Sequence, residues 1–293
     1  MDLRFHIDAV NITDLAFQFW CEKKVELSHI YRIKPSYPMQ KGRKFHEMLR
    51  EEVFVHLPIV ARNFADYIYK EGYESYFSLK TLNTKGICRE LPVRGLFNKV
   101  PLVGKIDELN MNNDKIFIVE NKTENNLQKG FSNNENVRSY LNQIHVIQVM
   151  LYRYVLDQLV EGKYTINDFN SLYDINSLEL SQEFKRDLEK INLDKELKSI
   201  EGIYKKLFEE FSNMKLGDML FIRYYERDTK RLIKTIEVKY NKGEIENKLR
   251  YAIDYWLNKR EANPVSKEES WKCLRCEFFR DKCKVWAHLY VNK

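Results

Sequence analysis

Three residues on two adjacent apolar runs have the types and spacing that metal-assisted hydrolysis of a phosphodiester needs. Asp107 interrupts one run, and Glu120 and Lys122 end the next run, two residues apart. Side chains alternate along a strand with a period of two, so Glu120 and Lys122 share one face. Two carboxylates suffice to hold a hard cation such as Mg²⁺, and a lysine beside it can position a water or steady the phosphoryl group.

The same pattern also fits two amphipathic surface strands with salt bridges, because 31% of the residues are charged and an acid-x-Lys triplet then often arises by chance. The apolar run Ile116–Val119 argues against that interpretation, since such a run is typical of a strand buried on both faces. The Asn-Asn-Asp turn signal at 112–114 precedes it. We therefore expect residues 100–109 to pair with this run as a hairpin that brings Asp107 near Glu120.

Two predicted helices supply further polar side chains. Residues 42–53 have apolar positions at helical spacing and carry His46 near the predicted helix start. Residues 136–159 form a longer pattern, in which Gln148 and Tyr152 lie four apart on the apolar face. A satisfied histidine at a helix end fits His46 equally well. Likewise, Gln148 and Tyr152 also fit a buried polar pair bonded to backbone.

Three of the five cysteines follow a C-x2-C-x6-C pattern near the end of the chain. They are Cys273, Cys276 and Cys283. Nothing resembles a signal peptide, so a secreted disulfide scaffold is not expected, whereas zinc or an iron–sulfur cluster fits such thiolates. A fourth ligand would have to be Cys21 or Cys88, both far upstream. Cys21 ends a short predicted helix that Thr13 would cap, where it also fits an ordinary core residue.

The rest of the chain predicts one compact unit with a helical insertion. We expect residues 1–160 to form the core, 161–215 the insertion, and 216–293 a hairpin, a helix and the cysteine segment. The asparagine-rich stretch 124–136 predicts a loop at the mouth of the site. No apolar run approaches about 18 residues, so we expect no membrane span. The cytoplasm is the expected compartment, with an organelle or the nucleus left open.

Basic residues are concentrated in the last part of the chain. Residues 216–293 hold 18 Lys and Arg against 12 Asp and Glu, so the net charge of +6 can be assigned to this segment. We expect a basic surface there that contacts phosphates and makes binding salt-dependent. Five basic residues lie among the cysteines: Lys272, Arg275, Arg280, Lys282 and Lys284. An ordinary solvated face fits each of them equally well.

The order of these motifs resembles the PD-(D/E)xK nuclease superfamily, in its RecB-like branch. The matching residues are His46, Asp107, Glu120, Lys122, Gln148 and Tyr152. The resemblance implies that the histidine and both acids hold Mg²⁺ or Mn²⁺, that the lysine activates water, and that the glutamine and tyrosine shape the site. One departure is that Gly104-Lys-Ile-Asp107 replaces the Pro-Asp that names the superfamily, which is common in this branch.

Longer stretches resemble the exonuclease V, or defects-in-morphology, family of single-strand-specific DNA exonucleases. They are residues 12–22, 89–93, 103–109, 120–123 and 148–152, and with the cysteines they span nearly the whole chain. The resemblance implies an α/β fold: a PD-(D/E)xK core with a central mixed sheet flanked by helices, and an iron–sulfur staple joining the two chain ends. It implies a [4Fe–4S] cluster held by Cys21, Cys273, Cys276 and Cys283. Cys88 remains as a buried thiol without a role.

The resemblance also implies the substrate and the partners. We expect a monomer that degrades single-stranded DNA from a free end, with a preference for 5′ ends, in DNA repair or recombination. A single-strand-binding protein is a candidate partner. Two alternatives stay open: a CRISPR-associated nuclease that trims spacer precursors, and an inert iron–sulfur or zinc module that only binds DNA. Retention of the whole catalytic set argues against the inert module.

Overall fold

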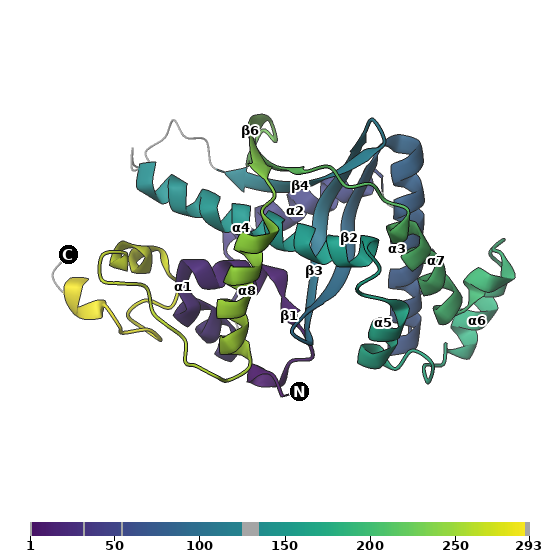
Figure 1. Ribbon diagram of the computed structural model, residues 1–293, viewed down its shortest axis with the longest axis horizontal. Helices are drawn as coiled ribbons and strands as arrows, with labels where there is room; N and C mark the ends of the chain where they lie inside the picture. Colours follow the sequence, from purple (N-terminus) through teal and green to yellow (C-terminus); the bar gives the residue numbers. More distant parts are fainter. Residues whose placement is uncertain (1, 32, 54, 125–134, 291–293) are drawn as a thin grey trace.

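A mixed six-stranded sheet lies at the centre of the protein, which the computed structural model describes for residues 2–31, 33–53, 55–124 and 135–290 (Figure 1). The strands are β1 (Val10–Asn11), β2 (Ile87–Phe97), β3 (Val100–Asn112), β4 (Lys115–Glu124), β5 (Met219–Glu226) and β6 (Leu232–Lys239). Their order is β1-β3-β4-β5-β6, and β2 also pairs with β3. The pairs β1–β3 and β4–β5 are parallel and the others are antiparallel. The expected α/β fold, a mixed sheet flanked by helices, is therefore confirmed.

The predicted hairpin of β3 and β4 is present. Glu108 pairs with Val119, so the next pair in the same register is Asp107 with Glu120. The turn places Asn113 and Asp114 at φ values of 48° and 59°. Asparagine and aspartate tolerate this left-handed conformation better than other non-glycine residues. Local turn chemistry therefore fixes the register that brings the two acids together.

Helices cover the sheet and frame the site (Figure 1). The larger ones are α1 (Ile12–Ile30), α2 (Tyr37–Glu51), α3 (Phe64–Lys85), α4 (Glu135–Val160) and α8 (Lys242–Trp256). Helix α4 packs against β2, β3, β4 and β5, and α1 and α8 pack against α4. Gly104 permits this close approach, because a Cβ there would lie 2.7 Å from Cε1 of Tyr152. Of the stretch 124–136, residues 125–134 lie outside the described residues.

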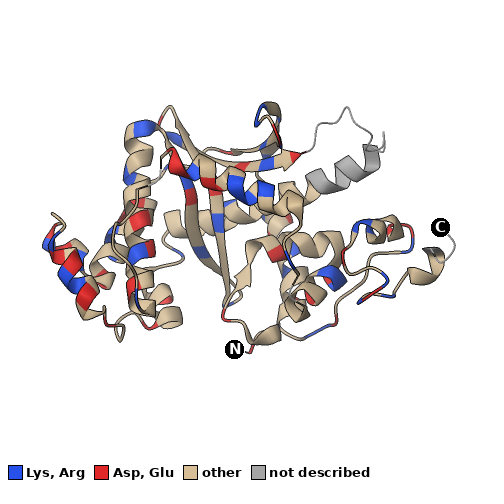
Figure 2. Ribbon diagram, turned by 180° about the vertical axis from the view of Figure 1, so that it is seen from behind, with Lys and Arg blue, Asp and Glu red and all other residues tan. Residues whose placement is uncertain are grey.

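Three short helices follow α4 in the segment 161–215. They are α5 (Ile166–Tyr173), α6 (Gln182–Glu189) and α7 (Ile200–Ser212), with a 3₁₀ turn at Lys195–Lys198. Helix α7 packs along α3, and acidic and basic residues alternate over the outlying α6 (Figure 2). Asp66, in the first turn of α3, accepts hydrogen bonds from the backbone N (2.9 Å) and Oγ (2.7 Å) of Ser181. The start of α3 is thus tied to this segment.

The two ends of the described chain pack against each other. Arg260 pairs with Glu22 of α1, whose carboxylate also accepts from the backbone N of Asn263 at 2.9 Å. Trp256 donates its indole N–H to Gln18 Oε1 at 2.8 Å. The segment after α8, with 3₁₀ turns at Ser270–Arg275 and Ala287–Tyr290, then runs back beside α1 (Figure 1). Within the described residues, no helix is long and apolar enough to cross a membrane.

Three local predictions were wrong. Asn11, rather than Thr13, caps α1, because its side chain accepts from the backbone N of Thr13 at 2.8 Å. The helix is also longer than expected, with a kink where Cys21 adopts φ −168° and ψ 112°. Helix α2 begins at Tyr37, so His46 lies well inside it rather than near its start.

Candidate metal-dependent active site

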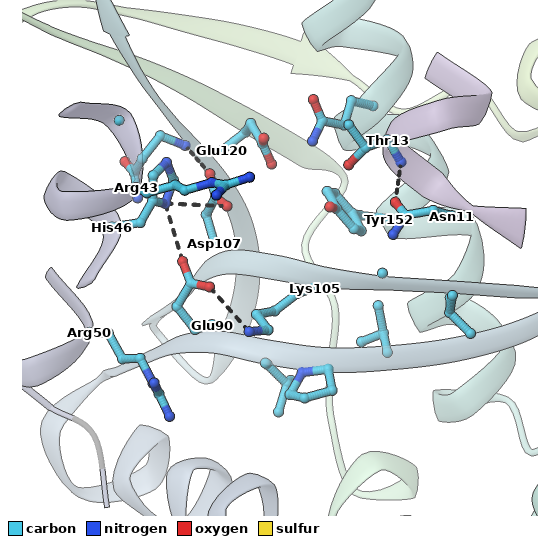
Figure 3. A pocket seen from close by; sticks show the side chains of 18 of the residues that line it. Asn11, Thr13, Arg43, His46, Arg50, Glu90, Lys105, Asp107, Glu120 and Tyr152 are labelled. Carbon is cyan, nitrogen blue, oxygen red and sulfur yellow. Dashed lines mark hydrogen bonds and ion pairs between the residues drawn. The ribbon is translucent and has the colours of Figure 1, made fainter. Parts of the chain in front are cut away.

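One cavity of about 1560 Å³ gathers all six residues predicted for catalysis. They are His46 from α2, Asp107 from β3, Glu120 and Lys122 from β4, and Gln148 and Tyr152 from α4. Figure 3 shows His46, Asp107 and Glu120 facing one another across this cavity. The sheet supplies the acids at its centre, and the two helices bring the remaining groups over them.

His46 contacts two carboxylates. Its Nδ1 lies 3.1 Å from Glu90 Oε1 and 3.6 Å from Asp107 Oδ1 (Figure 3). Among the described histidines, cysteines and acids, these three form the set whose ligand atoms all lie within 4.8 Å of one another. Nitrogen and carboxylate oxygen donors of this kind suit Mn²⁺ or Mg²⁺. The structure thus adds Glu90 to the predicted donors, while Glu120 lies outside this tight set.

Glu120 has a buried oxygen that no side chain satisfies. The residue is 1% exposed, and its Oε1 accepts from the Lys122 ammonium. Its Oε2 is buried and has no hydrogen-bond partner among the described residues. The Oδ2 of Asp107, in contrast, accepts from the backbone N of Asn121 at 2.8 Å. An orphaned carboxylate oxygen is costly, so this atom fits a bound cation.

Burial and neighbouring carboxylates shift the pKa values of three groups in the site. Burial and the Glu120 carboxylate raise the pKa of Asp107. Burial opposes the charged form of His46, but Asp107 and Glu90 outweigh it and raise the pKa of His46 to about 9. Burial likewise opposes the Lys122 ammonium, yet Glu120 and Asp107 raise the pKa of Lys122 overall. A divalent cation would offset both the burial and the Glu120 repulsion that raise the pKa of Asp107.

Lys122 is held in place from the helix side. Its Nζ donates to Gln148 Oε1 at 3.1 Å, in addition to Glu120. Tyr152 lies one turn further along α4, and burial, followed by the Glu120 and Asp107 carboxylates, raises the pKa of Tyr152 well above its usual value. Of the predicted pair, Gln148 therefore bonds to a side chain of the site, and Tyr152 lines the same cavity.

His145 also lines the cavity and was not predicted. Its Nδ1 lies 2.9 Å from the hydroxyl of Tyr224, which pairs with Lys122 across β4 and β5. Burial and then the Lys122 charge hold the pKa of His145 well below its usual value, so its ring is neutral. The sequence signal was the position of His145 three residues before Gln148, on the same helical face.

A buried ion pair behind the site fixes α2 to the sheet. Glu108 is 0% exposed, and Arg223 donates to its Oε1 at 2.7 Å while Arg89 Nε lies 3.1 Å from its Oε2. Arg89 also donates to the backbone O of Leu49 in α2 at 2.6 Å. Because α2 carries His46, this network couples the position of the histidine to the strands that carry the acids.

The four cysteines predicted as cluster ligands line a second, small cavity. They are Cys21, Cys273, Cys276 and Cys283. Burial, followed by the other three cysteines, raises the pKa of Cys273 to about 11, and burial also raises the pKa of Cys21. Cys88 is buried elsewhere at 1% exposure. Trp20 packs edge-on against Trp271 at 5.7 Å between ring centroids, which joins α1 to the cysteine segment.

The distances between the sulfur atoms can be compared with those that a single zinc ion requires. A single tetrahedral zinc would bring its sulfur ligands to about 3.8 Å from one another. Among the described cysteines, no three sulfur atoms all lie within 4.8 Å of one another. The four cysteines therefore surround the small cavity without three of their sulfur atoms meeting at that distance.

The basic surface predicted among the cysteines is only partly present. Lys272 is 3% exposed and lies 5.0 Å over the ring of Trp20, so it belongs to the lining of the cysteine cavity rather than to a surface. Arg275, in contrast, is exposed and lines the large cavity that holds the acids.

The chain is similar to one family of deoxyribonucleases. Residues 4–144 and 192–286 match a family model described as exonuclease V, a 5′ deoxyribonuclease. The chain is 26% identical to "Exonuclease V" of Danio rerio over 288 residues, which is 93% of this chain and 69% of the relative. It is 32% identical to "Exonuclease V, mitochondrial" of Candida tropicalis over 78 residues, 27% of this chain and 12% of the relative. The crystal structure of SSO0001 aligns with a TM-score of 0.43 and 11% identity, over 92% of this chain and 83% of that chain.

Proposed function

Because the chain belongs to the exonuclease V family, as its motifs predicted, we propose that it is a metal-dependent exonuclease that hydrolyses single-stranded DNA from 5′ ends. The observation that carries the proposal is the convergence of Asp107, Glu120 and Lys122 with His46 in one cavity. A buried carboxylate oxygen of Glu120 lies there without a hydrogen-bond partner among the described residues. A PD-(D/E)xK core is the arrangement that best describes this acid, acid and lysine set. A role in DNA repair or recombination follows from the substrate.

The donors fit Mg²⁺ or Mn²⁺. Asp107, Glu120 and His46 would hold the ion, with Glu90 as a further donor. When bound, the ion would supply a low-pKa water and polarise the phosphoryl oxygen. Lys122 stays protonated because Glu120 and Asp107 surround it, so it acts as a donor toward the phosphate or the attacking water rather than as a base. Gln148 and Tyr152 keep the ammonium aimed at that position.

The shape of the cavity suits a single strand. Its lining continues from the acids to Tyr67 of α3 and Tyr173 of α5, whose aromatic rings can stack on unpaired bases. Tyr67 is 57% exposed. Tyr173 comes from the segment 161–215, so this segment would help to enclose the strand. The 5′ preference is drawn from the family description alone.

A [4Fe–4S] cluster is the proposed occupant of the cysteine cavity. Burial raises the pKa of Cys21, Cys273 and Cys276, so gathering these thiols with Cys283 around one cavity is best explained by a metal that displaces their protons. The sulfur spacing favours the cluster over zinc. Held in this way, Cys21 of α1 and the three cysteines of the last segment would staple the two ends of the chain around the nuclease core.

The test is digestion of linear single strands labelled at the 5′ or the 3′ end, beside a circular single strand and a duplex, by anaerobically purified protein in Mg²⁺. We expect early release of short products from the 5′ label, retention of the 3′ label, and survival of the circle and the duplex. Rapid cutting of the circle would identify an endonuclease instead. Early release of the 3′ label would reverse the proposed polarity.

A further inference from the structure

Two arginines that line the large cavity differ from its other cationic side chains. Arg43 and Arg275 are exposed, and within the described part of the chain no hydrogen bond, ion pair or ring contact engages either guanidinium. The other lysines and arginines of the lining are engaged: they are Arg50, Lys70, Arg94, Lys105, Lys122 and Arg227. Two cavity-facing charges are therefore available to a ligand.

Arg43 lies beside the metal donors. It is three residues before His46 on α2, so the two side chains lie on the same side of the helix, one turn apart. Figure 3 shows Arg43 reaching toward Asp107 and Glu120. These carboxylates would be neutralised by the cation, which leaves the guanidinium to a different anion. A guanidinium presents paired donors that match two oxygens of a phosphate.

Arg275 comes from the cysteine segment. It lies between Cys273 and Cys276, where the backbone N of Cys276 donates to the O of Cys273 at 3.0 Å and closes a tight turn. Lys272 points into the cysteine cavity, whereas Arg275 lines the cavity of the acids. The cysteine segment therefore contributes directly to the proposed substrate site, in addition to joining the chain ends.

We propose that Arg43 and Arg275 bind backbone phosphates of the substrate strand, Arg43 at the phosphate next to the metal donors and Arg275 at a phosphate further along the cavity. This inference rests on the proposed function, since it assigns the strand to the same cavity. The two arginines have different roles in this proposal: Arg43 acts on the reacting phosphate, and Arg275 contributes affinity.

Binding can be measured with a labelled single strand over a series of salt concentrations, with Ca²⁺ in place of Mg²⁺ so that a cation still neutralises Asp107 and Glu120. Arg43→Ala and Arg275→Ala should each reduce the slope of log K against log salt by about 0.7, the value expected for one lost phosphate contact on a single strand. Lys44→Ala and Lys115→Ala are matched controls, because these lysines are exposed and absent from the cavity lining. Their slopes should equal that of the wild type. Arginine variants that behave like the lysine controls would overturn the proposal.

Kinetics separate the two roles. Arg43→Ala should lower kcat by about 100-fold, as for loss of one preorganised donor to the reacting group, whereas Arg275→Ala should raise KM with little change in kcat. Strands with a 5′ phosphate and a 5′ hydroxyl distinguish two sources of the anion for Arg43. A defect on both strands assigns Arg43 to an internal phosphodiester, and a defect only on the phosphorylated strand assigns it to the terminal phosphate. An unchanged kcat and KM on both would contradict a phosphate contact.

Two measurements distinguish a failure of this inference from a failure of the proposed function. If the wild type does not cleave single strands, the proposed function fails, while the salt slopes still report on the arginines. The iron and sulfide content of Arg275→Ala should equal that of the wild type, which shows that the cysteine segment is intact. A normal content with a normal salt slope would remove Arg275 from the substrate site.

Discussion

Lys122 of β4 donates a hydrogen bond to Gln148 of α4 across 3.1 Å, which links the strand that carries Glu120 to the helix that covers it. A hydrogen bond to a charged group contributes about 1.5–3 kcal/mol. If Gln148 orients the ammonium, Gln148→Ala should lower kcat by about 10- to 100-fold with little change in DNA affinity. Single-turnover digestion at saturating Mg²⁺ measures this.

Gln143→Ala is the matched control, because Gln143 is exposed on the same helix. It should retain the wild-type rate. Equal rates for Gln148→Ala and Gln143→Ala would show that the link between Lys122 and Gln148 has no part in catalysis.

Glu90 should affect metal affinity. Its Oε1 lies 3.1 Å from His46 Nδ1, and it belongs to the tight donor set with Asp107. Glu90→Gln keeps the shape but removes the charge, so the Mg²⁺ concentration for half-maximal activity should rise by about 10- to 100-fold. Glu124→Gln, a cavity-lining acid outside that donor set, should leave the metal dependence unchanged. Identical Mg²⁺ curves for the wild type and Glu90→Gln would exclude Glu90 as a donor.

The cysteines should separate into two classes. Cys276→Ala should yield colourless protein that lacks iron and sulfide and unfolds at a lower temperature, because cluster binding contributes folding free energy. Cys88→Ala should keep the cluster. In the native protein, Cys88 should resist alkylation, since burial raises its pKa to about 12. Wild-type protein that contains zinc and no sulfide would contradict the cluster, and a fully active, colourless Cys276→Ala would contradict the staple.

Asp66 should make stability depend on pH. Burial would raise the pKa of Asp66, but hydrogen bonds from Ser181 and from the backbone of Arg62 and Asn63 together lower it below 3.8. Because the folded state holds the ionised form, this stabilisation is present above pH 3.8 and is lost as the pH falls through the lower, folded-state pKa. Asp66→Asn should cost about 1–3 kcal/mol at pH 7, and urea unfolding should show this difference narrowing below pH 3.8.

Asp114→Asn is the control for that experiment, since asparagine also tolerates the left-handed turn at this position. Its stability should follow the wild type at every pH. A difference between Asp66→Asn and the wild type that stays constant into acid would mean that the charge of Asp66 is not what ties α3 to Ser181.

Local patterns predicted the hairpin and the helix that carries the site. The alternation of side chains along a strand placed Glu120 on the same face as Lys122. The turn residues Asn113 and Asp114 set the register between β3 and β4. Helix α3 was not predicted, because its buried positions mix polar residues such as Ser75 and Ser78 with apolar ones, so no apolar stripe stands out.

Contacts between residues far apart in the chain could not be predicted from the sequence. Glu90 joins the donors from a strand position with φ 54°, a conformation that no local pattern signals for glutamate. The burial of Lys272 depends on Trp20, more than two hundred residues earlier in the chain. That Arg43 and Arg275 lack partners within the described part of the chain depends on where every carboxylate of the cavity lies. These properties follow from tertiary packing, so periodicity and spacing could not predict them.

The measurement that tests the central claim most directly is the rate at which Asp107→Ala degrades a 5′-labelled single strand at saturating Mg²⁺. Asp107 contacts His46 and continues the register that places Glu120 opposite. If these residues hold the catalytic ion, the rate should fall by more than about 100-fold, which exceeds the loss expected for a group that only supports the metal ligands. Binding of the strand in EDTA should remain within about twofold, because phosphate contacts dominate affinity. An Asp107→Ala protein that degrades the strand at the wild-type rate would contradict the proposed site.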